Sequence, residues 1–275
     1  MMYNCLHYGK PALRSISPGV SGGAEGKKRD KKMRMRNKPW AKPELEASEY
    51  FVTEPEKLRG CWESRYEKKQ PFHIELGCGK GGFIAQAATR NTDINYLAID
   101  LEYKMLGLAR RKVARAYEEK GLSISNLMLT AYNIEKISLI LDEKDRAERI
   151  YINFCNPWPR NKHKKHRLTH PRQLMQYRQF LVPGGEIWFK TDDDPLFEES
   201  LEYFRECGFE ITYLTRDLHS EGRSDNIETE HEKMFSEEGI KIKFLTAVMA
   251  ELPEKNDDTD DTDDKEKSPA DEVLA

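Results

Sequence analysis

The chain has 275 residues, of which 38% are hydrophobic, and its 45 Lys and Arg nearly balance 48 Asp and Glu. No run of about 18 apolar residues is present and the N-terminus lacks a continuous apolar stretch, so we predict no membrane helix and no secretory signal. The five cysteines are scattered without a Cys-x-x-Cys pair, which favours a cytoplasmic protein without a disulfide framework.

Charge and composition divide the chain into three parts. Residues 1–32 are rich in Gly, Ser and Lys, and we predict that they are a disordered basic extension. Residues 251–275 hold eleven acids and three bases, a net charge of −8, and are predicted to be a disordered acidic tail. Residues 1–250 carry 42 bases against 37 acids, and within them residues 33–250 are expected to form one folded domain.

From residue 71 onward, short apolar runs alternate with amphipathic stretches. Strands are predicted at residues 73–76, 96–100, 127–132, 149–154 and 186–191, with two more at 209–215 and 240–249. Helices are predicted at residues 83–89, 101–119, 134–141, 172–181 and 196–207. This alternation predicts an α/β fold with a doubly wound, mostly parallel sheet.

A glycine-rich turn follows the first predicted strand. Gly77 and Gly79 are followed by Gly81 and Gly82, so the turn satisfies both G-x-G-x-G and G-x-G-x-x-G. Glycines in such a turn let the backbone pass close to a nucleotide-like ligand. The pattern alone fits either a dinucleotide or S-adenosylmethionine.

Two acidic residues bear on the choice between these cofactors. Glu75 ends a buried strand, where a carboxylate needs a cation or hydrogen-bond donors, and the amino group of S-adenosylmethionine would suit. Asp100 ends the second strand, where it can accept both ribose hydroxyls of an adenosine. The methyl donor is favoured, and a nicotinamide-dependent oxidoreductase is the alternative. In a purely structural interpretation, Glu75 caps a helix and Asp100 begins one.

The fourth predicted strand runs into a proline-fixed loop, Asn156-Pro-Trp-Pro-Arg160, which exposes the Asn156 amide and the Trp158 ring. Seven of the eight residues from Arg160 to Arg167 are basic or His, which indicates phosphate binding. A rigid loop followed by a solvated basic face is the alternative. No metal site is predicted, because convincing ligand spacing is missing from the nearby candidates Cys155, His163, His166 and His170.

Taken in order, these motifs resemble those of the bacterial tRNA (guanine-N7)-methyltransferase family. The resemblance extends from about residue 33 to 249 and rests on the segments 75–81, 99–100, 153–160, 163–168, 189–192 and 229–232. It implies a class I methyltransferase sheet of seven strands, the last antiparallel. It also implies S-adenosylmethionine as the donor and guanine 46 in the variable loop of tRNA as the substrate. Either a monomer or a homodimer is compatible with the sequence.

The resemblance also assigns roles to single residues. Donor contacts fall on Glu75, Asp100, Asn133 and Asn156, beside the glycine loop at Gly77 and Gly79. Substrate contacts fall on Arg160, Lys162, His163, Lys164, Lys165, His166, Arg167, Asp192, Thr229, Glu230, His231 and Glu232.

Four positions depart from the family pattern. Asn156 and Asn133 stand where the family commonly has Asp, and Arg160 and His166 replace a usual Lys and Arg. Asn156 occupies the proposed catalytic position, and an amide cannot act as a base. Guanine N7 carries a lone pair and no proton, so methyl transfer mainly needs alignment and charge stabilisation. We therefore expect an active enzyme, with a catalytically inactive tRNA-binding relative as the alternative.

Two of the implied substrate contacts have structural alternatives. Asp192 can accept from guanine or can cap the helix that begins before Pro195. Thr229 and Glu232 are three residues apart, the spacing of a capping box at a helix start.

Overall fold

A computed structural model describes residues 38–253. The predicted basic extension, residues 1–32, and residues 254–275 of the predicted acidic tail lie outside this part of the chain. The two predictions on these segments therefore stay predictions.

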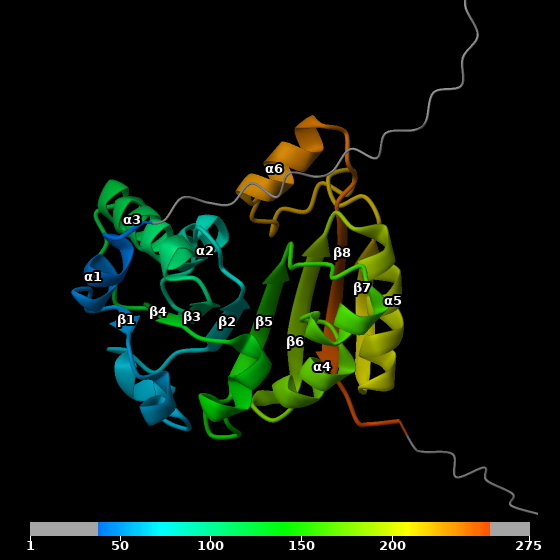
Figure 1. Cartoon of the computed structure of the whole chain (residues 1–275), viewed down its shortest axis with the longest axis horizontal. Coiled ribbons are helices and arrows are strands. Elements are labelled where there is room, and N and C mark those ends of the chain that lie inside the picture. Colours follow the sequence, from blue (N-terminus) through cyan, green and yellow to red (C-terminus); the bar gives the residue numbers. More distant parts are fainter. Residues whose placement is uncertain (1–37, 254–275) are drawn as a thin grey trace, which may run out of the picture. The chain divides into compact units, whose positions relative to one another are not determined.

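The strands are β1 (Phe51–Val52), β2 (Phe72–Leu76), β3 (Asn95–Asp100), β4 (Leu127–Ala131), β5 (Ala147–Asn153), β6 (Leu181–Thr191), β7 (Phe209–Thr215) and β8 (Lys243–Met249). They form one sheet in the order β1-β4-β3-β2-β5-β6-β8-β7 (Figure 1). Neighbours are parallel except β8, which is antiparallel to both β6 and β7. The strand order reverses between β2 and β5, and ligands of doubly wound sheets bind at the carboxyl ends of the strands beside such a reversal.

The helices are α1 (Ala41–Glu46), α2 (Gly82–Arg90), α3 (Tyr103–Glu119), α4 (Pro171–Tyr177), α5 (Asp194–Glu206) and α6 (Glu230–Glu237). Four short 3-10 helices are η1 (Pro55–Leu58), η2 (Trp62–Arg65), η3 (Ile134–Leu139) and η4 (Asn161–His166). In Figure 1, α1, α2 and α3 lie on the side of β1 to β4, whereas α4 and α5 lie on the side of β6 to β8. Helix α6 stands beyond the upper ends of the strands.

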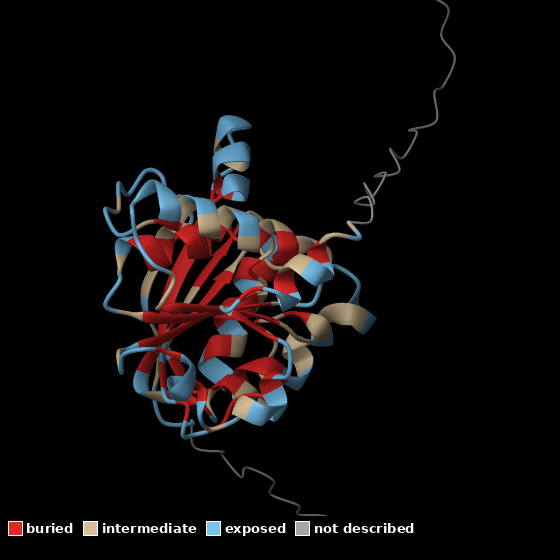
Figure 2. Cartoon of the chain, turned by 90° about the vertical axis from the view of Figure 1, so that its left-hand side faces the viewer, coloured by how far each residue is buried: buried red, intermediate tan, exposed pale blue. Residues whose placement is uncertain are grey.

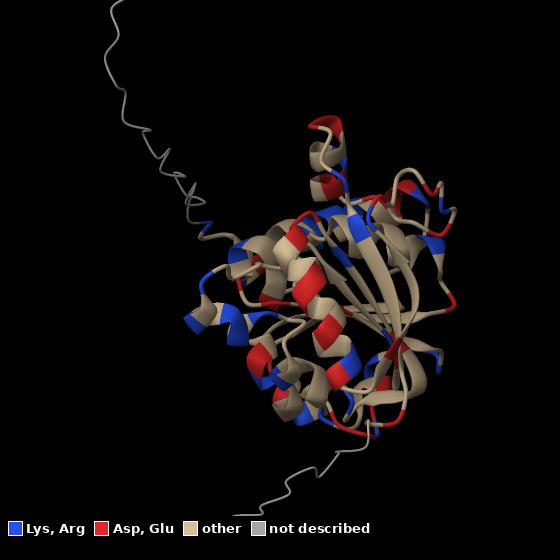
Figure 3. Cartoon of the chain, turned by 90° about the vertical axis from the view of Figure 1, so that its right-hand side faces the viewer, with Lys and Arg blue, Asp and Glu red and all other residues tan. Residues whose placement is uncertain are grey.

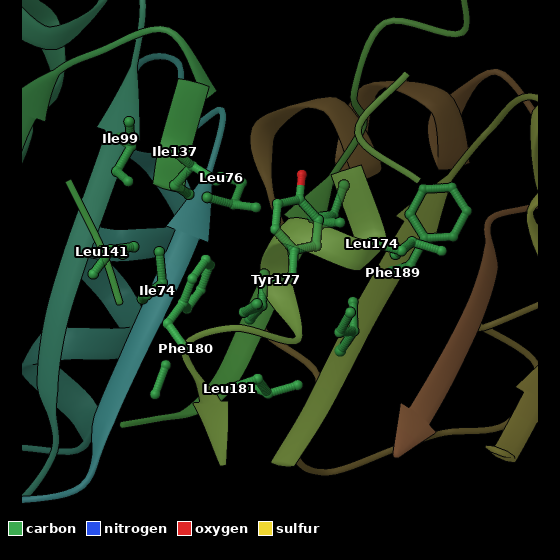
Figure 4. Packing of buried hydrophobic residues seen from close by; sticks show 14 of the residues in the cluster. Ile74, Leu76, Ile99, Ile137, Leu141, Leu174, Tyr177, Phe180, Leu181 and Phe189 are labelled. Atoms are coloured by element: carbon green, nitrogen blue, oxygen red, sulfur yellow. The ribbon is translucent and has the colours of Figure 1, made fainter. Parts of the chain in front are cut away.

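Side-chain alternation along the strands creates two separate cores. In β3, Leu97 and Ile99 join the cluster that contains Leu174 and Tyr177 of α4, whereas Tyr96 packs with the residues of α2 and α3. Figure 4 shows the first cluster from close by, and Figure 2 shows the strands as a buried layer between helices. Strands buried on both faces need the continuous apolar runs that the sequence contains.

Two glycines let α3 pack closely against its neighbours. A Cβ on Gly81, which has φ +73°, would lie 2.7 Å from the Cβ of Ala109 in α3. A Cβ on Gly107 of α3 would lie 2.6 Å from the Cβ of Ala41 in α1. Real Cβ atoms do not approach so closely, so any larger residue would push α3 away from the glycine loop or from α1.

The predicted fold class is confirmed, and the seven expected strands are present. The two-residue β1 is an additional edge strand, and the sequence did not predict it or the elements between Ala41 and Arg65. The helix predicted at 134–141 is the 3-10 helix η3, which is kinked at Lys136. The helix predicted at 172–181 ends at Tyr177. The chain is already extended at Leu181, where β6 begins and pairs with Ala147 of β5.

No helix within residues 38–253 is long and apolar enough to cross a membrane.

Candidate active site

A cavity of about 350 Å³ lies at the carboxyl ends of β2, β3 and β5. Small-molecule sites usually occupy roughly 300–1,000 Å³. The predicted site residues that line it are Glu75, Gly77, Gly79, Asp100, Asn156, His166, Thr229, Glu230 and His231. The fold therefore brings together residues that are up to 156 positions apart in the sequence.

Asp100 ties the glycine loop to the end of β3. The amide of Gly77 donates to the carbonyl of Ile99 at 2.9 Å, and the amide of Gly79 donates to Asp100 Oδ2 at 2.9 Å. Asp100 Oδ1 accepts from the amide of Glu102 at 2.9 Å, and α3 begins after Glu102, so Asp100 does not cap this helix. A carboxylate oxygen has two lone pairs, so each one retains capacity for a ribose hydroxyl. Burial raises the pKa of Asp100.

Glu75 is a buried carboxyl group with a hydrogen-bond partner on only one of its two oxygens among the described residues. It is 2% exposed, and its Oε1 accepts from Asn153 Nδ2 at 3.1 Å. Its Oε2 has no hydrogen-bond partner among the described residues. Burial raises the pKa of Glu75 to about 8. It does not cap α2, whose N-cap is Gly81. A buried, unpartnered carboxylate oxygen in a cavity wall fits a cationic ligand group.

The loop after β5 is held in a strained backbone conformation. Phe154 and Trp158 have φ values of +52° and +41°, in the left-handed region that non-glycine residues rarely adopt. The exposed Asn156 lies between them, and its Oδ1 accepts from the Trp158 amide at 3.1 Å. Strain of this kind persists only where the surrounding structure enforces it, as at binding sites. The loop thereby fixes Asn156 at the cavity.

The prediction that Arg167 contacts tRNA is corrected by its burial. Arg167 is 1% exposed, and its Nε donates to the carbonyl of Pro157 at 2.6 Å. Its guanidinium also pairs with Glu199 of α5 at 2.8 Å, as does Lys164 Nζ. A guanidinium with these partners is unavailable to phosphate. Arg167 instead fastens the Pro157 loop to α5.

The remaining basic residues of the segment differ in their accessibility. Three of them are exposed and form no ion pair with residues 38–253, namely Arg160, Lys162 and Lys165. His166 Nδ1 lies 2.6 Å from Glu135 Oε1, and the Trp158 ring lies 5.5 Å from that of His166 and 5.8 Å from that of His163. Figure 3 shows basic residues in blue beside α5, whose outer positions are largely acidic. These three exposed cations are therefore accessible from solvent.

The segment before α6 forms the predicted capping box. Thr229 Oγ1 accepts from the Glu232 amide at 3.0 Å, and the Thr229 amide donates to Glu232 Oε2 at 3.3 Å. Glu232 is 0% exposed, so the prediction that it contacts the substrate is corrected: its carboxylate points into the protein. Thr229, Glu230 and His231 line the cavity, and the His231 ring stacks on Phe154 at 6.1 Å.

Two other predicted contacts lie away from the cavity wall. Asp193, not Asp192, caps α5 by accepting from the Leu196 amide at 2.7 Å, so the capping alternative for Asp192 is wrong. Asp192 is half-buried at the end of β6. Asn133 accepts from the Glu135 amide at 3.0 Å and caps η3. Neither side chain lines the cavity.

Other residues of the wall had no predicted donor or substrate contact. They are Cys78, Lys80, Gly82, Phe83, Met105, Asn153, Phe154, Cys155, Trp158 and Leu168. Asn153 is the most informative, because an amide at the end of a buried strand signals a polar partner, which is Glu75. Among the described residues, no group of three or more His, Cys, Asp or Glu is arranged to hold a metal ion.

The doubly wound sheet and the cavity at the carboxyl end of β2 are typical of an α/β protein that binds a nucleotide-like ligand. Residues 69–245 match the model of a family described as "Putative methyltransferase", which makes this fold that of a class I methyltransferase. Proteins named tRNA (guanine-N(7)-)-methyltransferase are close relatives. Those of Clostridium perfringens (strain SM101 / Type A) and Clostridium beijerinckii are each 59% identical over 78% of this chain and 99% of their own length. That of Acetivibrio thermocellus is 53% identical over the same shares. The chain therefore belongs to the tRNA (guanine-N7)-methyltransferase family.

Replacement of Glu75 by Gln should stabilise the protein in the absence of ligand, and more so at alkaline pH. With a pKa raised from 4.5 to about 8, the folded protein binds this proton more tightly than the unfolded chain. The resulting stability is fully present below pH 4.5 and is lost as the pH rises through 8. Thermal unfolding of Glu75→Gln and wild type should show melting temperatures that agree at pH 4.5 and diverge up to pH 8.5. A difference that does not change with pH would contradict this prediction.

Proposed function

We propose that the protein transfers the methyl group of S-adenosylmethionine to N7 of guanine 46 in the variable loop of tRNA. Guanine N7 in tRNA is the target in the names of its relatives. The donor and position 46 follow the family resemblance of the motifs. None of these relatives supports the nicotinamide-dependent oxidoreductase or the inactive tRNA-binding protein. A tRNA substrate also agrees with the expected cytoplasmic location.

The observation that carries the donor assignment is the unpartnered Glu75 Oε2 in the cavity wall. When bound, S-adenosylmethionine supplies an electrophilic methyl group on a sulfonium, together with a cationic amino group. Glu75 would hold the amino group, and Asp100 would hold the ribose hydroxyls with the lone pairs that its backbone contacts leave free. A nicotinamide dinucleotide has no amino cation to match Glu75.

Attack by guanine N7 requires no general base, so the residues around it need only orient the purine and stabilise its growing positive charge. Asn156 lies at the cavity with its amide nitrogen outside the Asx-type hydrogen bond to Trp158. The carboxylate of Glu230 lines the same cavity and is paired with Lys112 of α3. Asn156 orients the base, and Glu230 places negative charge nearby.

Phosphate contacts fall to Arg160, Lys162 and Lys165, which are exposed. Their loop follows Asn156 directly, so RNA bound to them passes the cavity mouth. Such contacts give salt-dependent affinity without sequence preference. Selection of one guanine then depends on a base that leaves its stack to enter the cavity.

Incubation with labelled S-adenosylmethionine and unmodified tRNA should place label at 7-methylguanine 46. Cleavage mapping locates the modified base, and a tRNA with adenine at position 46 is the matched control. Glu75→Gln should reduce the transfer by more than about tenfold, because the amino group loses its charged partner. Transfer to another guanine would refute position 46, and absence of transfer at every salt concentration would refute the function.

Asn156→Asp should keep turnover unchanged or raise it by up to about tenfold, because a carboxylate stabilises a positive purine better than an amide. Single-turnover rates with saturating donor and tRNA measure the effect. Asn156→Ala is the matched control and should lose activity, because it removes the orienting group and the hydrogen bond to the Trp158 amide. A collapse of Asn156→Asp would show that the amide N–H is used.

The double substitution Lys162→Ala and Lys165→Ala should weaken tRNA binding and flatten its salt dependence. Each lost phosphate contact reduces the slope of log K against log salt by about 0.7–0.9. Filter binding between low and moderate salt measures this slope. Lys69→Ala with Lys144→Ala, exposed residues that precede β2 and β5, is the matched control and should leave the slope unchanged. Equal slopes for both double variants would show that Lys162 and Lys165 do not contact the phosphates of tRNA.

A further inference from the structure

Helix α6 is attached to the rest of the protein through a charged residue. Its only buried side chain is Glu232, and the rest of its surface is exposed or half-buried. Surface helices normally bury a stripe of apolar residues. In Figure 2, α6 stands out as a mostly exposed helix beyond the buried layer of strands. The half-buried Phe235 packs against Phe154 and the cluster of Leu218, Ile242 and Phe244, but the one fully buried side chain of α6 is the carboxylate of Glu232.

Glu232 belongs to a buried polar network centred on Lys190 of β6. Lys190 is 4% exposed, and its Nζ lies 3.1 Å from Glu232 Oε2 and donates to the carbonyl of Ile227 at 3.1 Å. It also donates to Asn226 Oδ1, while Asn226 Nδ2 donates to Glu232 Oε1 at 2.6 Å. Glu232 Oε2 further accepts from the Thr229 amide. The lysine thus fastens both α6 and the segment that precedes it.

The ion pair between Lys190 and Glu232 is sensitive to substitution, because both charged groups are buried. Removal of one partner from a buried pair leaves an uncompensated charge, which is strongly destabilising. The ion pair between the exposed Glu230 and the half-buried Lys112 is accessible to water and contributes less to stability. His219 Nε2 also lies 3.4 Å from Glu232 Oε1. The buried pair with Lys190 is therefore the stronger ionic attachment of the first turn of α6.

We propose that Lys190 is a positioning residue of this enzyme, which holds the segment Thr229–His231 against the cavity through its buried ion pair with Glu232. All three residues of this segment line the cavity, and the third directly precedes Glu232. Lys190 itself does not line this cavity. The consequence for methyl transfer rests on the function proposed above, whereas the anchoring of α6 does not.

Hydrogen exchange tests the anchoring without any substrate. Lys190→Met should increase amide exchange of residues 229–237 at least tenfold and leave β2, β3 and β5 protected. Glu232→Gln, which retains the size of the side chain and one carbonyl acceptor for the cap, should do the same. The double variant should exchange less than either single variant, because no buried charge is left unpaired. Unchanged exchange in α6, or a double variant no better than both singles, would overturn the proposal.

Steady-state kinetics test the positioning role. Lys190→Met should lower kcat/KM for tRNA at least tenfold and leave the Kd of S-adenosylmethionine within about threefold, measured by calorimetry. The double variant should recover part of the loss. Lys57→Met, which removes an exposed ion pair with Glu54 on residues that do not line the cavity, is the matched control and should change kcat/KM less than about fivefold. An equal loss of affinity for S-adenosylmethionine and for tRNA would show that Lys190 only stabilises the fold, and would overturn the positioning role. A wild type that methylates no guanine would refute the proposed function and leave the exchange result intact.

Discussion

Burial of charge at the carboxyl ends of the central strands is the constraint on which this site depends. Glu75 of β2 and Glu232 of α6 are both almost fully buried. Glu232 obtains its cation from within the chain, Lys190, and the pair holds a helix in place. Glu75 obtains only an amide, and burial raises its pKa to about 8. Glu232 is therefore structural, whereas Glu75 keeps an unpartnered oxygen that fits the cationic group of the proposed methyl donor.

The same sheet face connects the two systems. Asn153 of β5, which donates to Glu75, is the register partner of Lys190 of β6. Glu75 and the anchor of α6 are therefore connected through neighbouring residues of two paired strands. Parallel strands at the reversal of the sheet bring their carboxyl ends together, so short polar side chains from different strands meet without long loops. The ends of the central strands form one part of the cavity lining, and the segment Thr229–His231 forms another.

The basic segment after β5 has two functions that its sequence does not separate. Arg167 and Lys164 face Glu199 of α5 and fix the loop that carries Asn156. The other cations of the segment remain in solvent. A residue whose guanidinium has carboxylate and carbonyl partners contributes to loop geometry, and an exposed lysine contributes to long-range attraction of RNA. In the proposed function, the first group positions Asn156 and the second group attracts the tRNA.

The sequence by itself determined the fold class, the glycine loop, Asp100 and the family, because these depend on local alternation and short motifs. It also determined the capping box at Thr229, since both partners lie within four residues. Only the tertiary structure decided which charged groups are paired. Arg167 meets Glu199, and Glu232 meets Lys190, across 32 and 42 residues. Tertiary packing decides which of these distant residues come into contact. Burial then determines whether a charge stabilises the fold or stays available to a ligand.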